Sequence, residues 1–457
     1  MRKLSETNFY SLKDSEETFL IHKENKYQIS YKDFIIDIAK SLEYISKLEK
    51  DTITIFIDNA YYFITVMSAA LLLKKKVNVL NNNSPKYVDK IIDNSMVYIS
   101  DDEKSHISLK NIFDGEYDEK WIDFLKSNEI DENLNVNFYT SGFTGFPKLI
   151  EKTLKQFEAE ALKIIGEFGE GLKDSIFVYS VPHYHSYGFV FDFLVPYILE
   201  LKLADNRINY LETLNNFEEY KNITFVTNPA FLKRIDKSSL KIKSKWTVFS
   251  STGALDKEVN DLCIETFNTD AIEIYGSTEG GCMAYRKRSE KDLWTRVKIV
   301  KLKVDENGSL SCSSGYTGEG LWVHVGDVVD MKNEDEFELL GREDSIVKIE
   351  GKRISVQQID RQILEDKNFK DSYTIYCKSE NREYVASFIV LSDENANEEE
   401  MRKYLKDYLK GYFEKILIPK KIYFTDRIPR TELGKIDRKQ LDAIMEKFEV
   451  LNKSYEV

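Results

Sequence analysis

The residues best suited to chemistry in this sequence lie in short glycine clusters, of which the first is Phe138–Lys148 (FYTSGFTGFPK). Glycines let backbone N–H groups approach an anion, and the ammonium of Lys148 adds a positive charge. The segment follows a strand-like run and predicts a phosphate-binding loop made by Thr140, Ser141, Gly142, Thr144, Gly145 and Lys148. It is not a Walker loop, because Pro147 and Leu149 flank the lysine where that motif needs Gly and Ser or Thr. For this segment alone, a surface turn is the alternative.

The second cluster, Glu273–Gly281 (EIYGSTEGG), places Glu279 beside the hydroxyl of Thr278. Tyr275 and Gly276 belong to the strand-like run and turn that precede them. Mg²⁺ carried by a nucleotide takes few protein oxygens, because phosphates and water supply the rest. Glu279 is therefore a candidate Mg²⁺ ligand, and a solvated turn is the alternative.

Two more clusters lie in the last third of the chain. Asp327 follows a glycine, and Arg342 lies in the segment Gly341–Asp344 (GRED). A fixed carboxylate can accept from both hydroxyls of a ribose, and a nearby arginine can bind ribose or phosphate. Surface charge pairing is the alternative. Lys435 lies on a glycine turn near the C-terminus, where a solvated lysine is the ordinary interpretation.

These clusters follow segments whose apolar patterns alternate between strand and helix. Strand-like runs are Thr52–Ile57, Val77–Leu80, Val97–Ser100, Ile176–Ser180, Thr224–Val226, Thr247–Ser250 and Ile272–Tyr275. Helix-like stretches include Tyr61–Leu73, Thr153–Phe168 and Lys257–Phe267. Such alternation is typical of an α/β protein with parallel sheets covered by helices. Thr153, followed three residues later by Gln156, predicts a capping box at the start of its helix.

Beyond about residue 300 the pattern changes to short strands separated by turns, such as Gly320–Val325 and Phe337–Leu340. The last hundred or so residues, 356–457, predict a small α+β unit. We place the boundary near Gly341–Ser345. This gives a large N-terminal domain over residues 1–343 and a small C-terminal domain over residues 344–457.

The composition excludes several classes of protein. The 457 residues include 65 Lys and Arg against 78 Asp and Glu, a formal net charge of −13. An acidic surface repels phosphate backbones, so we expect no nucleic-acid partner. The longest apolar stretches are too short or too charged to span a membrane, and the N-terminus has no apolar signal-peptide core. The four cysteines form no CxxC pair, which favours free thiols in a reducing compartment, and we expect a cytoplasmic protein.

Taken in order, the clusters resemble the motifs of the AMP-forming acyl- and aryl-CoA synthetases, the adenylate-forming family, from about residue 30 to 440. The resemblance implies the adenylate-forming fold, with layered sheets and helices in the large domain and a mobile C-terminal domain. It implies ATP and Mg²⁺ as cofactors and a small carboxylic acid, fatty or aromatic, as substrate. The acid would form an acyl-adenylate and then pass to a pantetheine thiol of CoA or of an acyl carrier protein. A monomer or a dimer fits the family.

The same resemblance implies roles for single residues. Thr140–Lys148 corresponds to the pyrophosphate loop, and Thr278 and Glu279 to the contacts with the α-phosphate and Mg²⁺. Asp327 and Arg342 correspond to the residues that hold the ribose hydroxyls. Gly253, Tyr275 and Gly276 correspond to further nucleotide-binding positions.

Four other residues have implied roles in the acid site and the C-terminal domain. His185, in Pro182–Gly188 (PHYHSYG), corresponds to the histidine beside the acyl carboxylate. Asp344 corresponds to the hinge, Gly351 to the pantetheine tunnel and Lys435 to the catalytic lysine of adenylation.

A closer resemblance, carried by Lys152–Gln156, His183–Gly188 and Val347–Ser355, links the chain to synthetases of fatty-acid-like and aryl-polyene gene clusters. Those enzymes are thought to load a starter acid onto a carrier protein. Phe143 and Leu149 depart from the family pattern, and Phe143 removes one hydroxyl from the phosphate loop.

Three alternatives to an acyl-CoA or acyl-carrier-protein synthetase stay open. One is a stand-alone adenylation enzyme of secondary metabolism, which shares all of these motifs. A second is a non-catalytic nucleotide-binding relative, and the presence of Glu279, Asp327, Arg342 and Lys435 together argues against it. A third, a P-loop NTPase, is disfavoured by the wrong Gly-Lys spacing.

Overall fold

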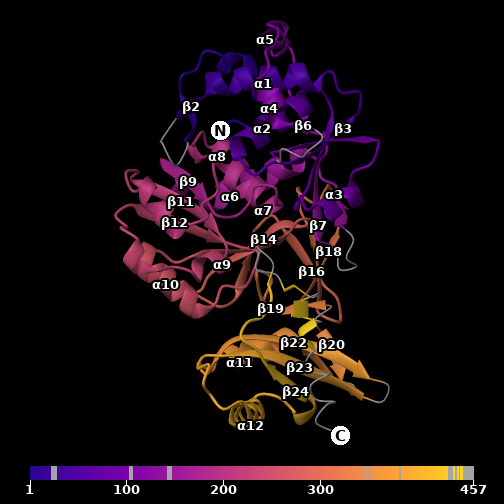
Figure 1. Cartoon of the computed structure of the whole chain (residues 1–457), viewed down its shortest axis with the longest axis vertical. Helices are drawn as coiled ribbons and strands as arrows, with labels where there is room; N and C mark the ends of the chain where they lie inside the picture. Colours follow the sequence, from indigo (N-terminus) through magenta and orange to yellow (C-terminus); the bar gives the residue numbers. More distant parts are fainter. Residues whose placement is uncertain are drawn as a thin grey trace. The chain divides into compact units, whose positions relative to one another are not determined.

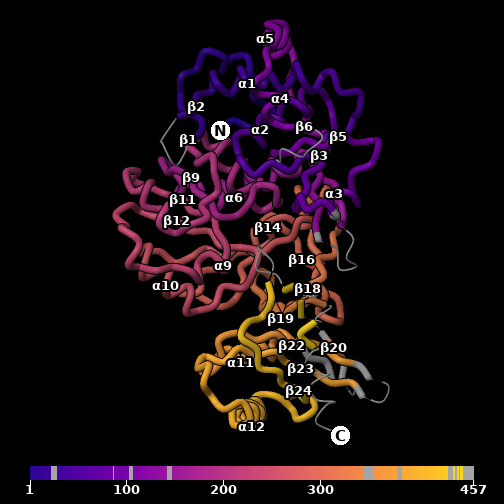
Figure 2. Tube along the Cα trace, viewed as in Figure 1, coloured from indigo at the N-terminus to yellow at the C-terminus, as the bar shows by residue number. Residues whose placement is uncertain are grey.

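The computed structural model describes residues 1–21, 28–101, 107–141, 147–343, 346–349, 352–379, 382–430, 436–437, 440–441 and 443–445. The chain divides into two compact units. Unit 1 comprises Met1–Leu302 and Cys312–Val323, and unit 2 comprises Lys303–Ser311 and His324–Val457. Figure 1 shows the elements of each unit, and Figure 2 the course of the chain through them. Among the described residues, no helix combines the length and apolarity needed to cross a membrane.

One sheet of unit 1 carries the predicted phosphate loop. Its strand order is β6 (Ile107–Ser108), β5 (Met96–Ser100), β3 (Thr52–Phe56), β4 (Lys76–Val79), β7 (Val136–Ser141) and β8 (Pro147–Ile150). All neighbouring pairs are parallel except β7 and β8, which form an antiparallel hairpin. Its helices are α1 (Tyr31–Ile45), α2 (Ala60–Leu72), α3 (Pro85–Ile91), α4 (Leu109–Phe113) and α5 (Lys120–Phe124). Nearly all of α2 is buried, as expected of a helix that is apolar on every side.

A second sheet of unit 1 carries the other predicted cluster. Its order is β15 (Trp294–Arg296), β14 (Gly281–Lys287), β13 (Ile272–Ser277), β12 (Lys245–Ser250), β11 (Asn222–Thr227), β9 (Ser175–Tyr179), β10 (Leu203–Ala204), β1 (Thr18–Ile21) and β2 (Gln28–Ser30). The central strands from β9 to β13 are parallel, and β14 reverses direction against β13. An apolar core lies between these strands and the segments α9 (Pro229–Leu232), α10 (Lys257–Phe267) and η3 (Leu211–Phe217).

Helix α6 (Leu154–Leu172) and the π-helix η2 (Phe189–Leu194) pack against each other, and α6 also contacts β14. Rings from three elements interlock here: Phe138 of β7, Phe157 of α6 and Phe189 of η2 have centroids 5.2–5.5 Å apart. Thr153 caps α6 with the predicted capping box, because its side chain accepts from the Gln156 backbone while the Gln156 side chain accepts from the Thr153 backbone. The short helices α7 (Ser186–Gly188) and α8 (Val195–Ile198) flank η2.

Unit 2 holds residues 303–304 of β16 (Lys301–Val304) and residues 309–311 of β17 (Ser309–Ser313). It also holds all of β18 (Val323–Met331) except Val323, and β19 (Glu336–Arg342). Beyond them are a hairpin of β20 (Ile346–Ile349) and β21 (Lys352–Ser355), and a sheet ordered β22 (Phe369–Ser379), β23 (Arg382–Leu391) and β24 (Lys421–Phe424). Helices α11 (Val356–Leu364) and α12 (Glu398–Leu409) pack on an apolar core with this sheet. The predicted strand over 320–325 starts only at Val323, because Gly320 turns with a φ of 72°.

The architecture confirms the predicted fold class, an α/β N-terminal part and a small α+β C-terminal part. The boundary predicted between residues 343 and 344 stays a prediction.

Candidate functional site

The second predicted cluster forms the turn of a hairpin, because Thr278–Gly280 join β13 to β14. The backbone N–H of Gly280 donates to Ser277 Oγ at 2.9 Å, which closes the turn. The Glu279 side chain lies at the tip and is 31% exposed. A carboxylate held at the end of two strands is fixed in place and still open to a ligand.

The lysine of the phosphate loop reaches this turn. Lys148 pairs with Thr140 across the β7–β8 hairpin, and the Thr140 hydroxyl donates to the Lys148 carbonyl at 3.3 Å. Lys148 Nζ lies 2.9 Å from Glu279 Oε1, although the two residues are 131 positions apart. Both side chains are partly exposed, so this ion pair contributes at most about 1 kcal/mol to folding. Its significance is that the two predicted clusters meet.

The remaining loop residues Gly142, Phe143, Thr144 and Gly145, together with the side chain of Ser141, lie outside what the structure describes.

The PHYHSYG segment contacts the same turn, since Ser186 Oγ donates to Thr278 Oγ1 at 3.1 Å. His185 is partly buried, precedes α7 and has its ring 5.5 Å from that of Tyr184. His183 is 1% exposed, and its Nε2 lies 2.8 Å from the Ile57 carbonyl oxygen. Burial lowers the pKa of His183 to about 4, so its imidazole is neutral at physiological pH.

The described residues contain no group of three or more His, Cys, Asp or Glu side chains arranged to hold a metal ion.

The residues that the family resemblance assigns to nucleotide binding lie at or just beyond the ends of β12 and β13. Tyr275 is buried, with its ring 5.4 Å from that of Trp294. Ser251 Oγ donates to the Ile274 carbonyl at 2.8 Å and so ties the segment after β12 to β13. Gly253 lies in that segment, directly after Thr252, whose φ of 72° marks a sharp turn. These contacts bring Gly253, Tyr275 and Gly276 to neighbouring strand ends.

The third cluster lies in unit 2. Asp327 of β18 and Arg342 of β19 are opposite each other in the antiparallel register, with Nη1 and Oδ1 3.1 Å apart. Arg342 Nη1 also donates to the Val325 carbonyl at 3.2 Å. A Cβ on Gly326, whose φ is 76°, would lie only 3.0 Å from the guanidinium. The Asp327–Arg342 pair is therefore preassembled, and its role in ribose binding stays a prediction. Asp344, Gly351 and Lys435 lie outside the described residues.

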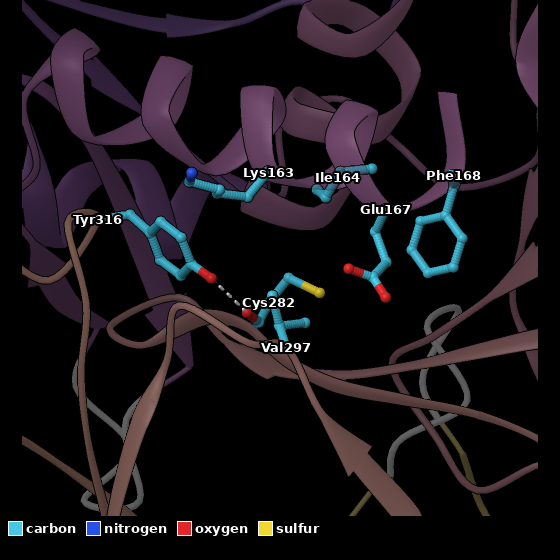
Figure 3. A pocket seen from close by; sticks show the side chains of 7 residues that line it. All are labelled: Lys163, Ile164, Glu167, Phe168, Cys282, Val297 and Tyr316. Carbon is cyan, nitrogen blue, oxygen red and sulfur yellow. Dashed lines mark hydrogen bonds between the residues drawn. The ribbon is translucent and has the colours of Figure 1, made fainter. Parts of the chain in front are cut away.

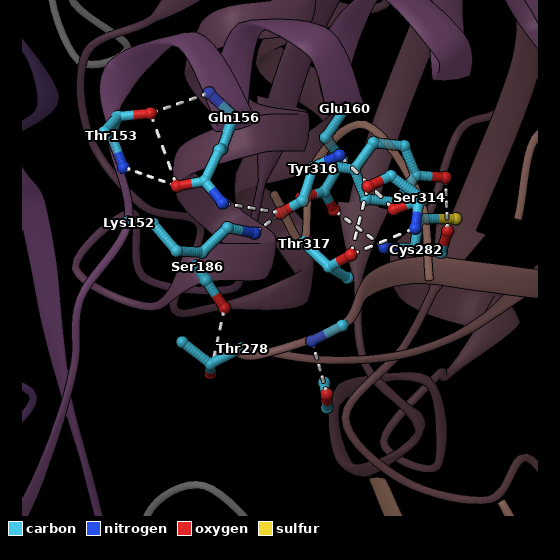
Figure 4. Close-up of polar contacts among 12 residues, drawn as sticks. Lys152, Thr153, Gln156, Glu160, Ser186, Thr278, Cys282, Ser314, Tyr316 and Thr317 are labelled. Atoms are coloured by element: carbon cyan, nitrogen blue, oxygen red, sulfur yellow. Dashed lines mark hydrogen bonds and ion pairs between the residues drawn. The ribbon is translucent and has the colours of Figure 1, made fainter. Parts of the chain in front are cut away.

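Sequence reasoning missed a buried polar network behind the turn. Figure 4 shows Lys152, Glu160, Cys282 and Tyr316 together with the capping box of α6. Lys152 Nζ lies 3.4 Å from Glu160 Oε2, and the two side chains are 3% and 8% exposed. The signal available in the sequence was weak, because a glutamate on a charged helix normally indicates a solvated face.

Two cavities are lined by described residues. The first is a narrow crevice that leaves no room for a water molecule; its lining residues are Lys163, Ile164, Glu167, Phe168, Cys282, Val297 and Tyr316 (Figure 3). The second, of about 480 Å³, lies beside α1 and the start of α2. Its carboxylate Asp37 is already bound by the Tyr61 hydroxyl at 2.7 Å and by Lys40 at 3.1 Å.

Comparison with known proteins gives two family matches. A family model described as "AMP-binding enzyme" matches residues 37–319, and one described as "AMP-binding enzyme C-terminal domain" matches residues 375–435. A mitochondrial acyl-coenzyme A synthetase of Rattus norvegicus is 24% identical over 353 residues, which is 67% of this chain and 61% of that protein. 4-Coumarate:CoA ligase 1 of Petunia hybrida is 23% identical over 351 residues, covering 67% of this chain and 64% of the ligase. The aligned part thus spans less than two thirds of either relative.

Solved structures share the fold. The o-succinylbenzoate coenzyme A synthetase of Bacillus subtilis in complex with AMP has a TM-score of 0.77 at 16% identity, covering 95% of this chain and 98% of the synthetase. An anthranilate CoA ligase in complex with anthranoyl-AMP has a TM-score of 0.73 at 16% identity, covering 96% of this chain and 97% of the ligase.

Proposed function

Because the chain belongs to the AMP-binding enzyme family, we propose that it activates a carboxylic acid with ATP and transfers the acyl group to a thiol. The observation that carries this proposal is the meeting of three separate motifs at one turn. Lys148 pairs with Glu279 at 2.9 Å, and Ser186 donates to Thr278 at 3.1 Å. One turn therefore brings together a cation, a carboxylate and two hydroxyls from distant parts of the sequence. Such groups could bind and neutralise the reacting anions.

The first half-reaction joins two anions, so its barrier is electrostatic. A carboxylate oxygen of the acid attacks the α-phosphorus of ATP, the bond between that phosphorus and the α–β bridging oxygen breaks, and pyrophosphate leaves. We assign Lys148 and the loop residues Thr140, Ser141, Gly142, Thr144 and Gly145 to the departing phosphates. Thr278 is assigned to the α-phosphate and His185 to the acyl carboxylate. Lys148 forms an ion pair with Glu279 in the structure, and a phosphate of bound ATP would compete for that cation.

The residues present fit a nucleotide-borne Mg²⁺. Glu279 offers one partly exposed carboxylate beside the Thr278 hydroxyl, and Mg²⁺ accepts few protein oxygens when phosphates supply others. When bound, the ion would neutralise charge on the phosphates. The chain's own part is to hold Glu279 at a closed turn.

The roles at the nucleoside end are assigned from the family resemblance. We propose that Asp327 accepts from the ribose hydroxyls while Arg342 holds that carboxylate in place. Gly253, Tyr275 and Gly276 would line the base and sugar.

The second half-reaction follows by resemblance. A thiol sulfur attacks the acyl carbon, the bond from that carbon to the AMP oxygen breaks, and AMP leaves. We propose that residues 344–457 form a mobile domain hinged at Asp344. This domain would bring Lys435 for adenylation and Gly351 for the pantetheine, in the manner of a hinge transition.

We propose a fatty or aromatic acid as substrate and CoA or an acyl carrier protein as acceptor. The acyl- and aryl-acid names of the relatives support the acid, and the resemblance to starter-loading synthetases supports the carrier. A cytoplasmic location is proposed from the buried thiols Cys263, Cys282 and Cys312. The assembly is a monomer or a dimer.

The test is a pyrophosphate-release screen of fatty, hydroxybenzoic and cinnamic acids with Mg·ATP, repeated with CoA and with a carrier protein as acceptor. Acid-dependent pyrophosphate release and an acyl thioester are expected. Retained ATP binding with no pyrophosphate from any acid would favour a non-catalytic relative, and acyl-adenylate without thioester would favour a stand-alone adenylation enzyme.

A further inference from the structure

Helix α6 carries two glutamates that are almost completely buried, and they bind different parts of unit 1. Glu158 accepts from the backbone and the hydroxyl of Ser5, at 2.8 and 2.5 Å. Glu160 accepts from the backbone N–H of Cys282 at 2.8 Å. Residues two apart on a helix lie on nearly opposite sides, so one glutamate anchors the N-terminal segment and the other reaches the β13–β14 hairpin.

Two side chains form hydrogen bonds with the backbone of Cys282 at the start of β14, one with its N–H and one with its carbonyl. Glu160 takes the N–H of Cys282, and the Tyr316 hydroxyl donates to the Cys282 carbonyl at 3.0 Å. Figure 4 shows both contacts beside the turn. The strand register shifts between Tyr275 and Gly276, opposite this point, so the ladder itself is irregular here. The position of the turn therefore depends on these two side chains.

The side chain of Glu160 is tightly packed against the hairpin. Gly281 has a φ of 69°, and a Cβ on it would lie 2.7 Å from both Glu160 Oε2 and a Tyr316 ring carbon. The hairpin backbone thus lies directly against the carboxylate. A displacement of Glu160 would move the turn Thr278–Gly280, which directly precedes Gly281.

Lys152 supplies the countercharge and links the network to the phosphate loop. Its Nζ lies 3.4 Å from Glu160 Oε2, and its carbonyl accepts from Val136 of β7 at 2.8 Å. A buried ion pair adds little net stability compared with an apolar pair of the same size. A carboxylate oxygen, unlike an apolar group, fixes the direction of one N–H.

We propose that Glu160 is a positioning residue that holds the Thr278–Glu279 turn in place for Mg·ATP, with Lys152 as its countercharge. This inference rests on the proposed function and extends it to residues that touch no substrate. Two properties of the network then have different roles. The balance of charge between Lys152 and Glu160 maintains folding, and the hydrogen bond from Cys282 to Glu160 positions Glu279.

The experiment compares two neutral replacements of the pair. In the double variant Lys152→Met, Glu160→Met, both charges and the acceptor for Cys282 are lost while volume is kept. In Lys152→Met, Glu160→Gln, the charges are lost but an amide oxygen can still accept from Cys282. Glu158→Met is the matched control on the same helix. Calorimetry measures ATP affinity with Mg²⁺ and with EDTA, so the gain due to Mg²⁺ is obtained without any acid.

We expect the methionine double variant to lose about tenfold of the Mg²⁺-dependent gain, the size of one buried hydrogen bond. The glutamine double variant and Glu158→Met should keep the gain within about threefold of wild type, and ATP affinity in EDTA should be the same in all proteins. A folded methionine double variant with the wild-type gain would overturn the proposal, as would a loss shared equally by Glu158→Met.

If the methionine double variant does not fold, Tyr316→Phe decides, because it removes only the hydroxyl bonded to the Cys282 carbonyl. A reduced gain supports the proposal and a wild-type gain overturns it. If the ATP affinity of the wild-type protein is the same with Mg²⁺ and with EDTA, the proposed function is refuted, and this inference with it.

Discussion

At the scale of single residues, Glu279 is expected to have the largest charge effect on catalysis. Replacing it by glutamine keeps its size and removes the negative charge that faces Lys148. We expect Glu279→Gln to slow pyrophosphate release at limiting Mg²⁺ by at least about tenfold, because a ligand of the metal acts through the charge it supplies. The KM for the acid should change far less.

The measurement is the initial rate against Mg²⁺ concentration at saturating ATP. Glu290→Gln is the control, since Glu290 is also an exposed acid of unit 1 paired with a lysine. If Glu279→Gln and Glu290→Gln give the same curve as wild type, Glu279 is only a turn residue.

His183 allows a prediction about pH and stability. Burial lowers its pKa to about 4 in the folded state, against 6.5 for an ordinary histidine. The unfolded chain therefore binds an extra proton between these values, and the free energy of unfolding falls as pH drops from 6.5 toward 4. At pH 5 the loss from this residue is about 2 kcal/mol.

Urea unfolding of wild type and His183→Gln at pH 7.5 and pH 5 measures this contribution. The glutamine amide can replace Nε2 as the donor to the Ile57 carbonyl but does not titrate. The variant should show a smaller difference between the two pH values. An equal difference in both proteins would mean that His183 is protonated in the folded state at pH 5.

The sequence allowed prediction of the residues that contact a ligand better than of those that support them. Lys148 and Glu279 stand out because glycine and hydroxyl clusters surround them, and the structure brings them together. Lys152 and Glu160 could not be found in this way. Charged residues are usually solvated, and only the three-dimensional path of β14 brings the Cys282 N–H to Glu160.

At the scale of elements, the start of α6 was predicted correctly because a capping box is a local pattern. Thr153 and Gln156 exchange side-chain and backbone hydrogen bonds as expected. Thr153→Ala should lower the stability of unit 1 by about 1 kcal/mol, because one N-terminal N–H loses its acceptor. Thr153→Ser should cost much less.

Thermal unfolding of the three proteins measures the effect, with Tyr and Trp fluorescence as the probe. A lower midpoint for the alanine variant and a near-wild-type midpoint for the serine variant are expected. Equal midpoints for alanine and wild type would show that tertiary contacts alone hold the start of α6.

The β13–β14 hairpin was not predicted, although the segment before it was. The run Ile272–Tyr275 indicated a strand that ends in a turn, but no strand was predicted after that turn. Instead the chain turns within Thr278–Gly280 and returns antiparallel. The turn depends on Gly281 at a φ of 69° and on contacts with Glu160 and Tyr316, which come from distant parts of the sequence.

At the scale of the whole molecule, the two half-reactions should depend on different residues. If Lys435 acts only in adenylation, Lys435→Ala should abolish acyl-adenylate formation and spare thioester formation from a supplied acyl-adenylate. The reason is that its charge offsets the repulsion between two anions, which exists only in the first step. Assaying each half-reaction separately measures this, and equal loss in both would contradict a scheme with two conformations.

The most direct test of the central claim is the fate of the acid's oxygen. When a carboxylic acid labelled with oxygen-18 in its carboxylate is turned over with ATP and a thiol acceptor, attack on the α-phosphorus must carry one labelled atom into AMP. Mass spectrometry of the nucleotide product should therefore find AMP that contains one oxygen-18. Unlabelled AMP, or ADP in place of AMP, would contradict an acyl-adenylate mechanism for this chain.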